Sequence, residues 1–169
     1  MTKFFLTLHV LAAIIAIGPV TVASSMFPAT LRRARADPQD TAAVSSLRLL
    51  QRICSVYAFV GVAVPVTGFA TASSLNVLTS AWLIASIVLT MAAAVVLIIL
   101  VLPRQEAALA AVAGEGGDGE GGQLADGAGT VVLGERASTR LAMYTGVFNL
   151  LWATVTVLMI IRPGSTTGA

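Results

Sequence analysis

Charged residues are scarce in this chain. Asp, Glu, Lys and Arg together make up 11% of the 169 residues, whereas 57% are hydrophobic. A soluble domain usually carries about 25% charged residues, which keep its surface wetted. With so few charges the chain cannot cover a water-facing surface, and we expect its apolar surface to face a lipid bilayer. The length leaves room for a single domain, residues 1–169.

Cysteine and histidine are equally scarce. Cys54 is the only cysteine, which excludes an intrachain disulfide, a thiolate metal cage and a CxxC redox pair. His9 is the only histidine, so the chain alone cannot supply a bis-histidine haem site. We therefore expect no cofactor, no metal site and, because no catalytic constellation is visible, no enzyme activity. The ten Lys and Arg residues lie between apolar blocks, which argues against nucleic-acid binding despite the net charge of +2.

Long apolar runs dominate what is present. Four blocks of 20 to 23 residues lack Asp, Glu, Lys and Arg entirely: 5–27, 53–72, 80–102 and 141–161. About 20 helical residues cross a hydrocarbon layer of about 30 Å. Inside that layer only helices or closed barrels satisfy their own backbone groups, and these runs show no strand alternation. The sequence thus predicts an all-α fold, a bundle of four transmembrane helices.

The first run could instead belong to a signal peptide, because Lys3 gives a basic start and residues 21–23 resemble a cleavage site. Secretory apolar regions are usually only 7–15 residues long, however, and this run continues to Phe27. A cluster of arginines follows directly and resists translocation. An uncleaved membrane anchor is therefore favoured. The cluster is also expected to bind anionic lipid headgroups; it consists of Arg32, Arg33 and Arg35.

Basic residues are distributed unequally between the two predicted sides. Loop 28–52 carries five arginines and loop 103–140 carries three, whereas the other side has only Lys3 and Arg162. Lys and Arg are enriched in cytoplasmic loops. The sequence thus predicts a multi-pass plasma-membrane protein with both loops in the cytoplasm and both termini outside.

The two loops differ in character. Asp37 is predicted to cap a helix that starts at Pro38, with Asp40 in its first turn, so the second helix would begin before the membrane. The third helix is expected to continue past Pro103 through an Ala-rich stretch. Gly114–Gly129 holds eight glycines and four acidic residues, which predicts a disordered linker.

His9 is the one side chain among Asp, Glu, Lys, Arg and His that lies inside a predicted span, and such groups are functional candidates. It shares a helical stripe with small residues, so we expect it to face the bundle. The leading interpretation is a neutral histidine hydrogen-bonded to Thr67, Thr71 or Thr156. Haem or metal ligation, with Met159 as a second ligand or with a partner chain's histidine, is an alternative, and so is proton or ligand handling.

Small residues recur at helical spacing in the second and fourth runs. Their principal members are Gly61, Pro65, Gly68 and Gly146. They are interpreted as tight helix packing with a kink at Pro65; a hinge or an opened backbone beside a ligand cavity is the alternative.

Polar and aromatic residues inside the runs have predicted roles of their own. Asn149 is expected to join two helices, and Trp152 needs a hydrogen-bond partner for its indole N–H. Three aromatic residues near the predicted interfaces are typical of membrane anchors; they are Tyr57, Tyr144 and Trp82.

The run from Leu8 to Pro19, with His9 followed by Gly18, resembles the first helix of a bacterial family of four-helix integral membrane proteins of unknown function. The high Ala, Val and Arg content with one lysine is similar to that of actinobacterial proteins. The resemblance implies a four-helix membrane fold along the whole chain.

We expect a non-enzymatic accessory subunit or scaffold of a larger membrane complex, with respiratory complexes among the candidates, bound to other membrane subunits or to itself. The alternative is a protein that handles or transports a small molecule, a metal or haem through His9. These are functional hypotheses from composition, packing pattern and analogy.

Overall fold

The computed structural model describes residues 2–37, 39–114 and 127–164, and these residues form helices without any strand. The elements are α1 (Thr2–Ala36), α2 (Thr41–Val60), α3 (Ala63–Leu75), α4 (Ala81–Val95), the π-helix η1 (Val96–Val101), α5 (Leu102–Ala113) and α6 (Gly127–Ile161). Within the described residues, four helical stretches are long and apolar enough to cross a membrane: Lys3–Ala36, Thr41–Leu75, Ala81–Ala113 and Arg136–Ile161. Each predicted run falls on one of them, with only Ser80 of the third run lying just before its stretch, so the all-α prediction with four candidate spans is confirmed.

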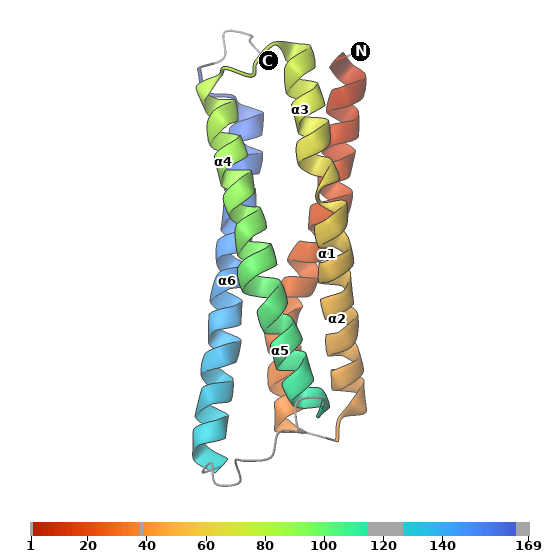
Figure 1. The fold of residues 1–169 in the computed structure, drawn as a ribbon, viewed down its shortest axis with the longest axis vertical. Coiled ribbons are helices and arrows are strands. Elements are labelled where there is room, and N and C mark those ends of the chain that lie inside the picture. Colours follow the sequence, from red (N-terminus) through yellow and green to blue (C-terminus); the bar gives the residue numbers. More distant parts are fainter. Residues whose placement is uncertain (1, 38, 115–126, 165–169) are drawn as a thin grey trace.

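The helices run roughly parallel to one long axis (Figure 1). α1 packs against α2 and α3 along its length, and α6 packs against α4 and α1. The start of α1, the turn between α3 and α4 and the end of α6 lie at one end of the molecule (Figure 1). The turn between α1 and α2, the end of α5 and the start of α6 lie at the opposite end, so the described parts of the two arginine-bearing segments, 28–52 and 103–140, lie toward that end.

The core lies where α1, α2, η1 and α6 meet. Its largest fully buried apolar side chains are Phe27, Leu31, Leu47, Leu141 and Phe148. Outward positions carry apolar side chains as well: Phe59 is 82% exposed and Ile160 is 74% exposed. Burying apolar area stabilises a fold by about 25 cal/mol per Å² in water. Large side chains left this exposed indicate a lipid environment for the four stretches.

The second span is interrupted between α2 and α3, one turn before Pro65. Proline has no backbone N–H, so it cannot donate to the carbonyl of Gly61 four residues earlier. The N–H of Val64 bonds this carbonyl instead, at 3.1 Å, and the N–H of Val62 bonds Phe59 O at 3.1 Å. These tighter bonds satisfy the freed groups, which is how proline is tolerated inside a membrane helix.

The second helix starts later than predicted. α1 extends to Ala36, and the Asp37 carboxylate accepts a bond from the N–H of Gln39 at 3.0 Å, so it closes a turn. Asp40 is the N-cap, because its carboxylate accepts from the N–H of Ala43 at 2.9 Å. The cap predicted at Asp37 and the placement of Asp40 in the first turn are therefore wrong. Pro38 lies outside the described residues.

The third span continues past Pro103, as predicted. α4 passes through η1 directly into α5. A π-helical turn just before a proline relieves the clash between its ring and the preceding turn. α5 ends at Gly114, which has a φ of 74° and serves as a left-handed cap. Of the predicted linker, residues 127–129 belong to α6, and 115–126 lie outside the described residues.

Candidate functional site

His9 lies between α1 and α3, with 9% of its surface exposed. Its Nδ1 is 3.1 Å from the backbone oxygen of Val64 and 3.2 Å from Oγ1 of Thr67. Thr67 is one of the three hydroxyls proposed as its partner from the sequence, and the expected orientation of His9 toward the bundle is confirmed. The ring thus joins α1 to α3 next to the interruption of the second span.

The partners determine which ring nitrogen carries a proton. A carbonyl oxygen only accepts, so Nδ1 must carry the hydrogen that reaches Val64 O. The Thr67 hydroxyl donates to Ala63 O at 2.8 Å, and its oxygen can accept the same Nδ1–H. In the neutral ring Nε2 therefore holds the lone pair. Histidine is fixed in this way both in structural clamps and in metal sites.

Gly68 lies directly against the His9 ring. A Cβ built on Gly68 would be 3.0 Å from Cε1 and 3.3 Å from Nδ1. The absence of a side chain at Gly68 therefore makes room for the imidazole. The packing role predicted for Gly68 fits this contact, although the neighbour is a histidine ring and not the backbone of another helix.

The other three predicted packing residues behave differently. Gly61 is the C-cap of α2, and a Cβ on it would be 3.1 Å from the backbone oxygen of Ala58, so its close neighbour belongs to the same helix and not to another one. Pro65 is exposed. Nothing lies within 4 Å of a Cβ on Gly146, which is also exposed. The expected close packing at Gly146 is wrong, because α6 leaves an open notch toward α1 at that position.

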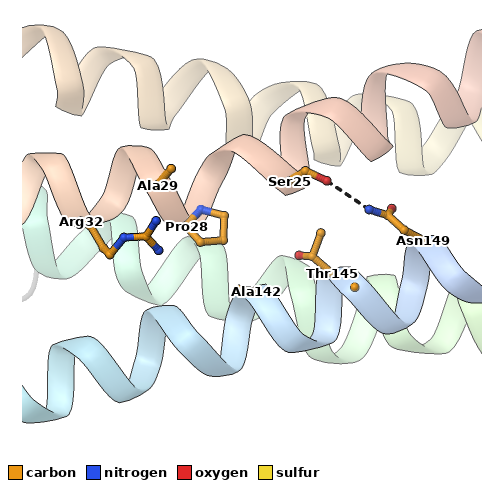
Figure 2. Close-up of a pocket in the computed structure, with 8 residues that line it drawn as sticks. Ser25, Pro28, Ala29, Arg32, Ala142, Thr145 and Asn149 are labelled. Carbon is orange, nitrogen blue, oxygen red and sulfur yellow. Dashed lines mark hydrogen bonds between the residues drawn. The ribbon is translucent and has the colours of Figure 1, made fainter.

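Asn149 joins α6 to α1, as predicted. Its Nδ2 donates to Oγ of Ser25 at 3.1 Å (Figure 2). Trp152 packs edge-on against Phe148, with ring centroids 6.5 Å apart and planes at 75°. Polar contacts between helices, such as the hydrogen bond from Asn149 to Ser25, contribute on the order of 0.6 kcal/mol each in membrane proteins.

Two of the predicted aromatic anchors are paired with arginines. The guanidinium of Arg104 lies 4.5 Å from the centroid of the Tyr144 ring, and that of Arg162 lies 5.7 Å from the Trp82 ring. Cation–π contacts of this geometry contribute about 0.5–1 kcal/mol at exposed sites. The Arg162–Trp82 contact lies at the end of the molecule that holds the start of α1, where interfacial residues are expected, whereas the Arg104–Tyr144 contact lies farther inside the bundle, at the start of α5 and the middle of α6.

Sequence reasoning missed two buried polar residues. Gln105 is fully buried, donates from Nε2 to Sγ of Cys54 at 3.7 Å, and has no partner for Oε1 among the described residues. Thr145 is 3% exposed, and its Oγ1 likewise has no partner there. The available signal was the four-residue spacing from Thr145 to Asn149, which puts both on one face of α6.

The arginine cluster is not uniform. Arg33 pairs with Asp40 at 2.9 Å, and Arg32 is exposed. The hydrogen bond from the Ala43 N–H, and secondarily Arg33, lowers the pKa of the Asp40 carboxyl below its ordinary value. Arg33 thus supports a helix cap, and Arg32 is the member that borders the α1–α6 notch. Among the described residues no group of three or more His, Cys, Asp or Glu side chains is placed to hold a metal ion.

Comparison of the chain with known protein families, with curated proteins and with solved structures finds no match. The resemblance of the first run to bacterial four-helix membrane proteins stays a prediction.

Proposed function

We propose that this chain is a non-enzymatic integral membrane protein that serves as an accessory subunit or scaffold within a larger membrane complex. The observation that carries the proposal is how its polar side chains are used inside the spans. His9 contacts Val64 and Thr67, Asn149 contacts Ser25, and Gln105 contacts Cys54. Each contact joins two different helices, so this polar chemistry holds the bundle together.

The outer faces of the helices support the same proposal. α4 presents a ridge of exposed apolar side chains at helical spacing: Ile84, Ile87, Val88, Met91 and Val95. In each candidate span only 11–22% of the most apolar window is buried within the chain. The remaining apolar surface is available to lipid and to the spans of other membrane proteins.

The proposal includes an orientation. Eight of the ten basic residues belong to the two loops that the fold brings to one end of the molecule, and the other two, Lys3 and Arg162, belong to the opposite end. The excess of arginine supports a cytoplasmic location for the loops and an outer location for both termini.

Partner capture tests the proposal. A photoreactive amino acid replaces Met91 on the exposed ridge of α4 or, as a matched control, the fully buried Leu47. After irradiation in cells and purification in mild detergent, we expect the Met91 variant to crosslink one or a few membrane polypeptides in stoichiometric amounts. The Leu47 variant should crosslink only within the chain. A solitary protein whose deletion leaves every membrane complex intact would overturn the proposal.

One observation favours a second candidate function, the binding of a metal or haem by His9. Metal-ligating histidines commonly donate one ring N–H to a backbone carbonyl, and His9 donates Nδ1–H to Val64 O while Nε2 keeps its lone pair. An absorption spectrum and metal analysis of the purified protein test this candidate. A chromophore or metal that is lost in His9→Ala would favour it over the scaffold role, and the absence of both would remove it.

A further inference from the structure

A notch opens between the C-terminal half of α1 and the middle of α6 (Figure 2). Small residues line its walls, among them Ala29, Ala142 and Gly146, and its volume is about 230 Å³. A water molecule occupies about 30 Å³ in the liquid. The notch therefore accommodates a group of several heavy atoms and not merely one bridging water.

Thr145 points an unpartnered hydroxyl into this notch. Hydroxyls inside membrane helices usually bond to the carbonyl four residues earlier. Thr67, Thr154 and Thr156 do so here, at 2.8, 2.8 and 2.9 Å. Thr145 is 3% exposed, yet its Oγ1 has no partner within the described parts of the chain. Figure 2 shows its side chain directed toward α1. A buried hydroxyl without a partner costs about 1–3 kcal/mol, so a ligand that bonds to it gains affinity.

Asn149 adds a second unsatisfied group one turn along the same face of α6. Its Nδ2 donates to Ser25, and its Oδ1 has no partner among the described residues. Oδ1 accepts a hydrogen bond, and the Thr145 hydroxyl donates or accepts one. A rotation of the Asn149 amide would present its NH₂ group instead, with Ser25 donating to Oδ1. The pair therefore suits hydroxyl and ester oxygens.

Arg32 supplies a positive charge at the mouth of the notch. It is exposed, and Figure 2 shows its guanidinium reaching into the space between α1 and α6. No carboxylate pairs with it in the described regions, whereas Arg33 is held by Asp40. Arg32 lies seven residues from Ser25, which corresponds to about 10 Å along a helix. The charge thus stands one to two turns from the two unsatisfied polar atoms.

We propose that this notch is a binding site for one anionic glycerophospholipid. Its phosphate pairs with Arg32, its ester oxygens accept hydrogen bonds from the Thr145 hydroxyl and from the NH₂ group of the rotated Asn149 amide, and its acyl chains extend over the exposed apolar faces of α1 and α6. In a glycerophospholipid the charged phosphate lies nearer the membrane surface than the ester oxygens. The same order is found in the notch, where Arg32 lies at the mouth and Thr145 and Asn149 lie deeper. Charge complementarity favours this ligand over an apolar helix from another protein, which would leave the guanidinium unpaired. The site is independent of the proposed role as an accessory subunit.

Native mass spectrometry of the purified protein tests the proposal. The protein is equilibrated with equimolar phosphatidylglycerol and phosphatidylcholine, and bound lipids are counted. We expect one phosphatidylglycerol to be retained in preference to phosphatidylcholine. Arg32→Gln should lower the affinity for phosphatidylglycerol about fivefold, which corresponds to the contribution of one arginine at the membrane surface. Thr145→Val should weaken it about threefold, the value of one membrane hydrogen bond. Because Oγ1 has no partner in the described chain, valine should leave the fold intact, and Thr145→Ser should retain binding.

The control is Arg52→Gln, which removes an exposed charge from α2 outside the notch. If Arg52→Gln and Arg32→Gln reduce the preference for phosphatidylglycerol equally, the lipid is attracted by the overall positive charge of the protein and not by the notch, and the proposed site is overturned. Equal retention of both lipids, or displacement of phosphatidylglycerol by inorganic phosphate, would also overturn it. So would a photoreactive group at Ala142 that captures a polypeptide in place of lipid in the native membrane.

Discussion

At the residue scale, His9 and Gly68 form a single feature. The imidazole is fixed by Val64 O and the Thr67 hydroxyl, and it fills the space that a side chain at Gly68 would need. Moving the ring aside would stretch both hydrogen bonds. The sequence identified both residues, but it placed them in separate patterns, because the contact joins positions 59 residues apart.

This pairing predicts a non-additive effect of two substitutions. Gly68→Ala should destabilise the protein by about 1 kcal/mol, because overpacking costs about 1–3 kcal/mol and the higher helix propensity of alanine returns up to about 1. In a His9→Ala background the same change should be neutral or stabilising, since the ring is gone. Unfolding in mixed micelles, followed by circular dichroism, measures both.

Gly146→Ala is the matched control, because nothing lies within 4 Å of its added Cβ. It should be neutral or slightly stabilising in both backgrounds. If Gly68→Ala has the same effect with and without the His9 ring, the two residues are not coupled.

At the scale of elements, helix ends and interruptions decide where each span lies. Pro65 interrupts the second span, and a π-helical turn precedes Pro103 in the third. The first of these was foreseen as a kink. The start of α2 was misplaced, because Asp37 and Asp40 are both good caps and the length of α1 determines which of them is used.

The cap of α2 predicts a pH dependence. The pKa of Asp40 is lowered below its ordinary value of 3.8, chiefly by the hydrogen bond from the Ala43 N–H. Because the carboxylate is favoured in the folded state, its stabilisation is fully present above pH 3.8 and is lost as the pH falls through the lowered pKa. Asparagine caps helices without titrating. The thermal midpoint of the wild type should therefore exceed that of Asp40→Asn by a constant margin near neutral pH, and the margin should disappear in acid.

The hydrogen bond from the Ala43 N–H and the ion pair with Arg33 both lower the pKa of Asp40, and the variant Arg33→Gln separates them. Because the backbone bond is the larger one, this variant should keep most of the difference in acid sensitivity from Asp40→Asn. Complete loss of that difference would assign the effect to the ion pair instead.

At the scale of the whole molecule, the α1–α2 turn, the end of α5 and the start of α6 share one end, and the start of α1, the α3–α4 turn and the end of α6 share the other (Figure 1). The orientation inferred from the arginines predicts which end an impermeant reagent can reach. Thr79→Cys, in the turn between α3 and α4, should react with a membrane-impermeant maleimide on intact cells. Gln39→Cys should react only after lysis, and the native Cys54 should stay unlabelled because it is fully buried. The reverse pattern would invert the orientation, and protein soluble without detergent would contradict membrane insertion.

The sequence by itself determined the four candidate spans and the clustering of basic residues between them, because both depend on composition over stretches as long as the bilayer is thick. It also predicted that His9 and Asn149 join helices, since a polar side chain left unpaired in an apolar span is costly. The tertiary structure alone decided which partners they have, that Gly146 stays open, and that Thr145 and Arg32 share one notch. These features depend on the separation and rotation of helices that are distant in the chain, and local spacing carries no information about either.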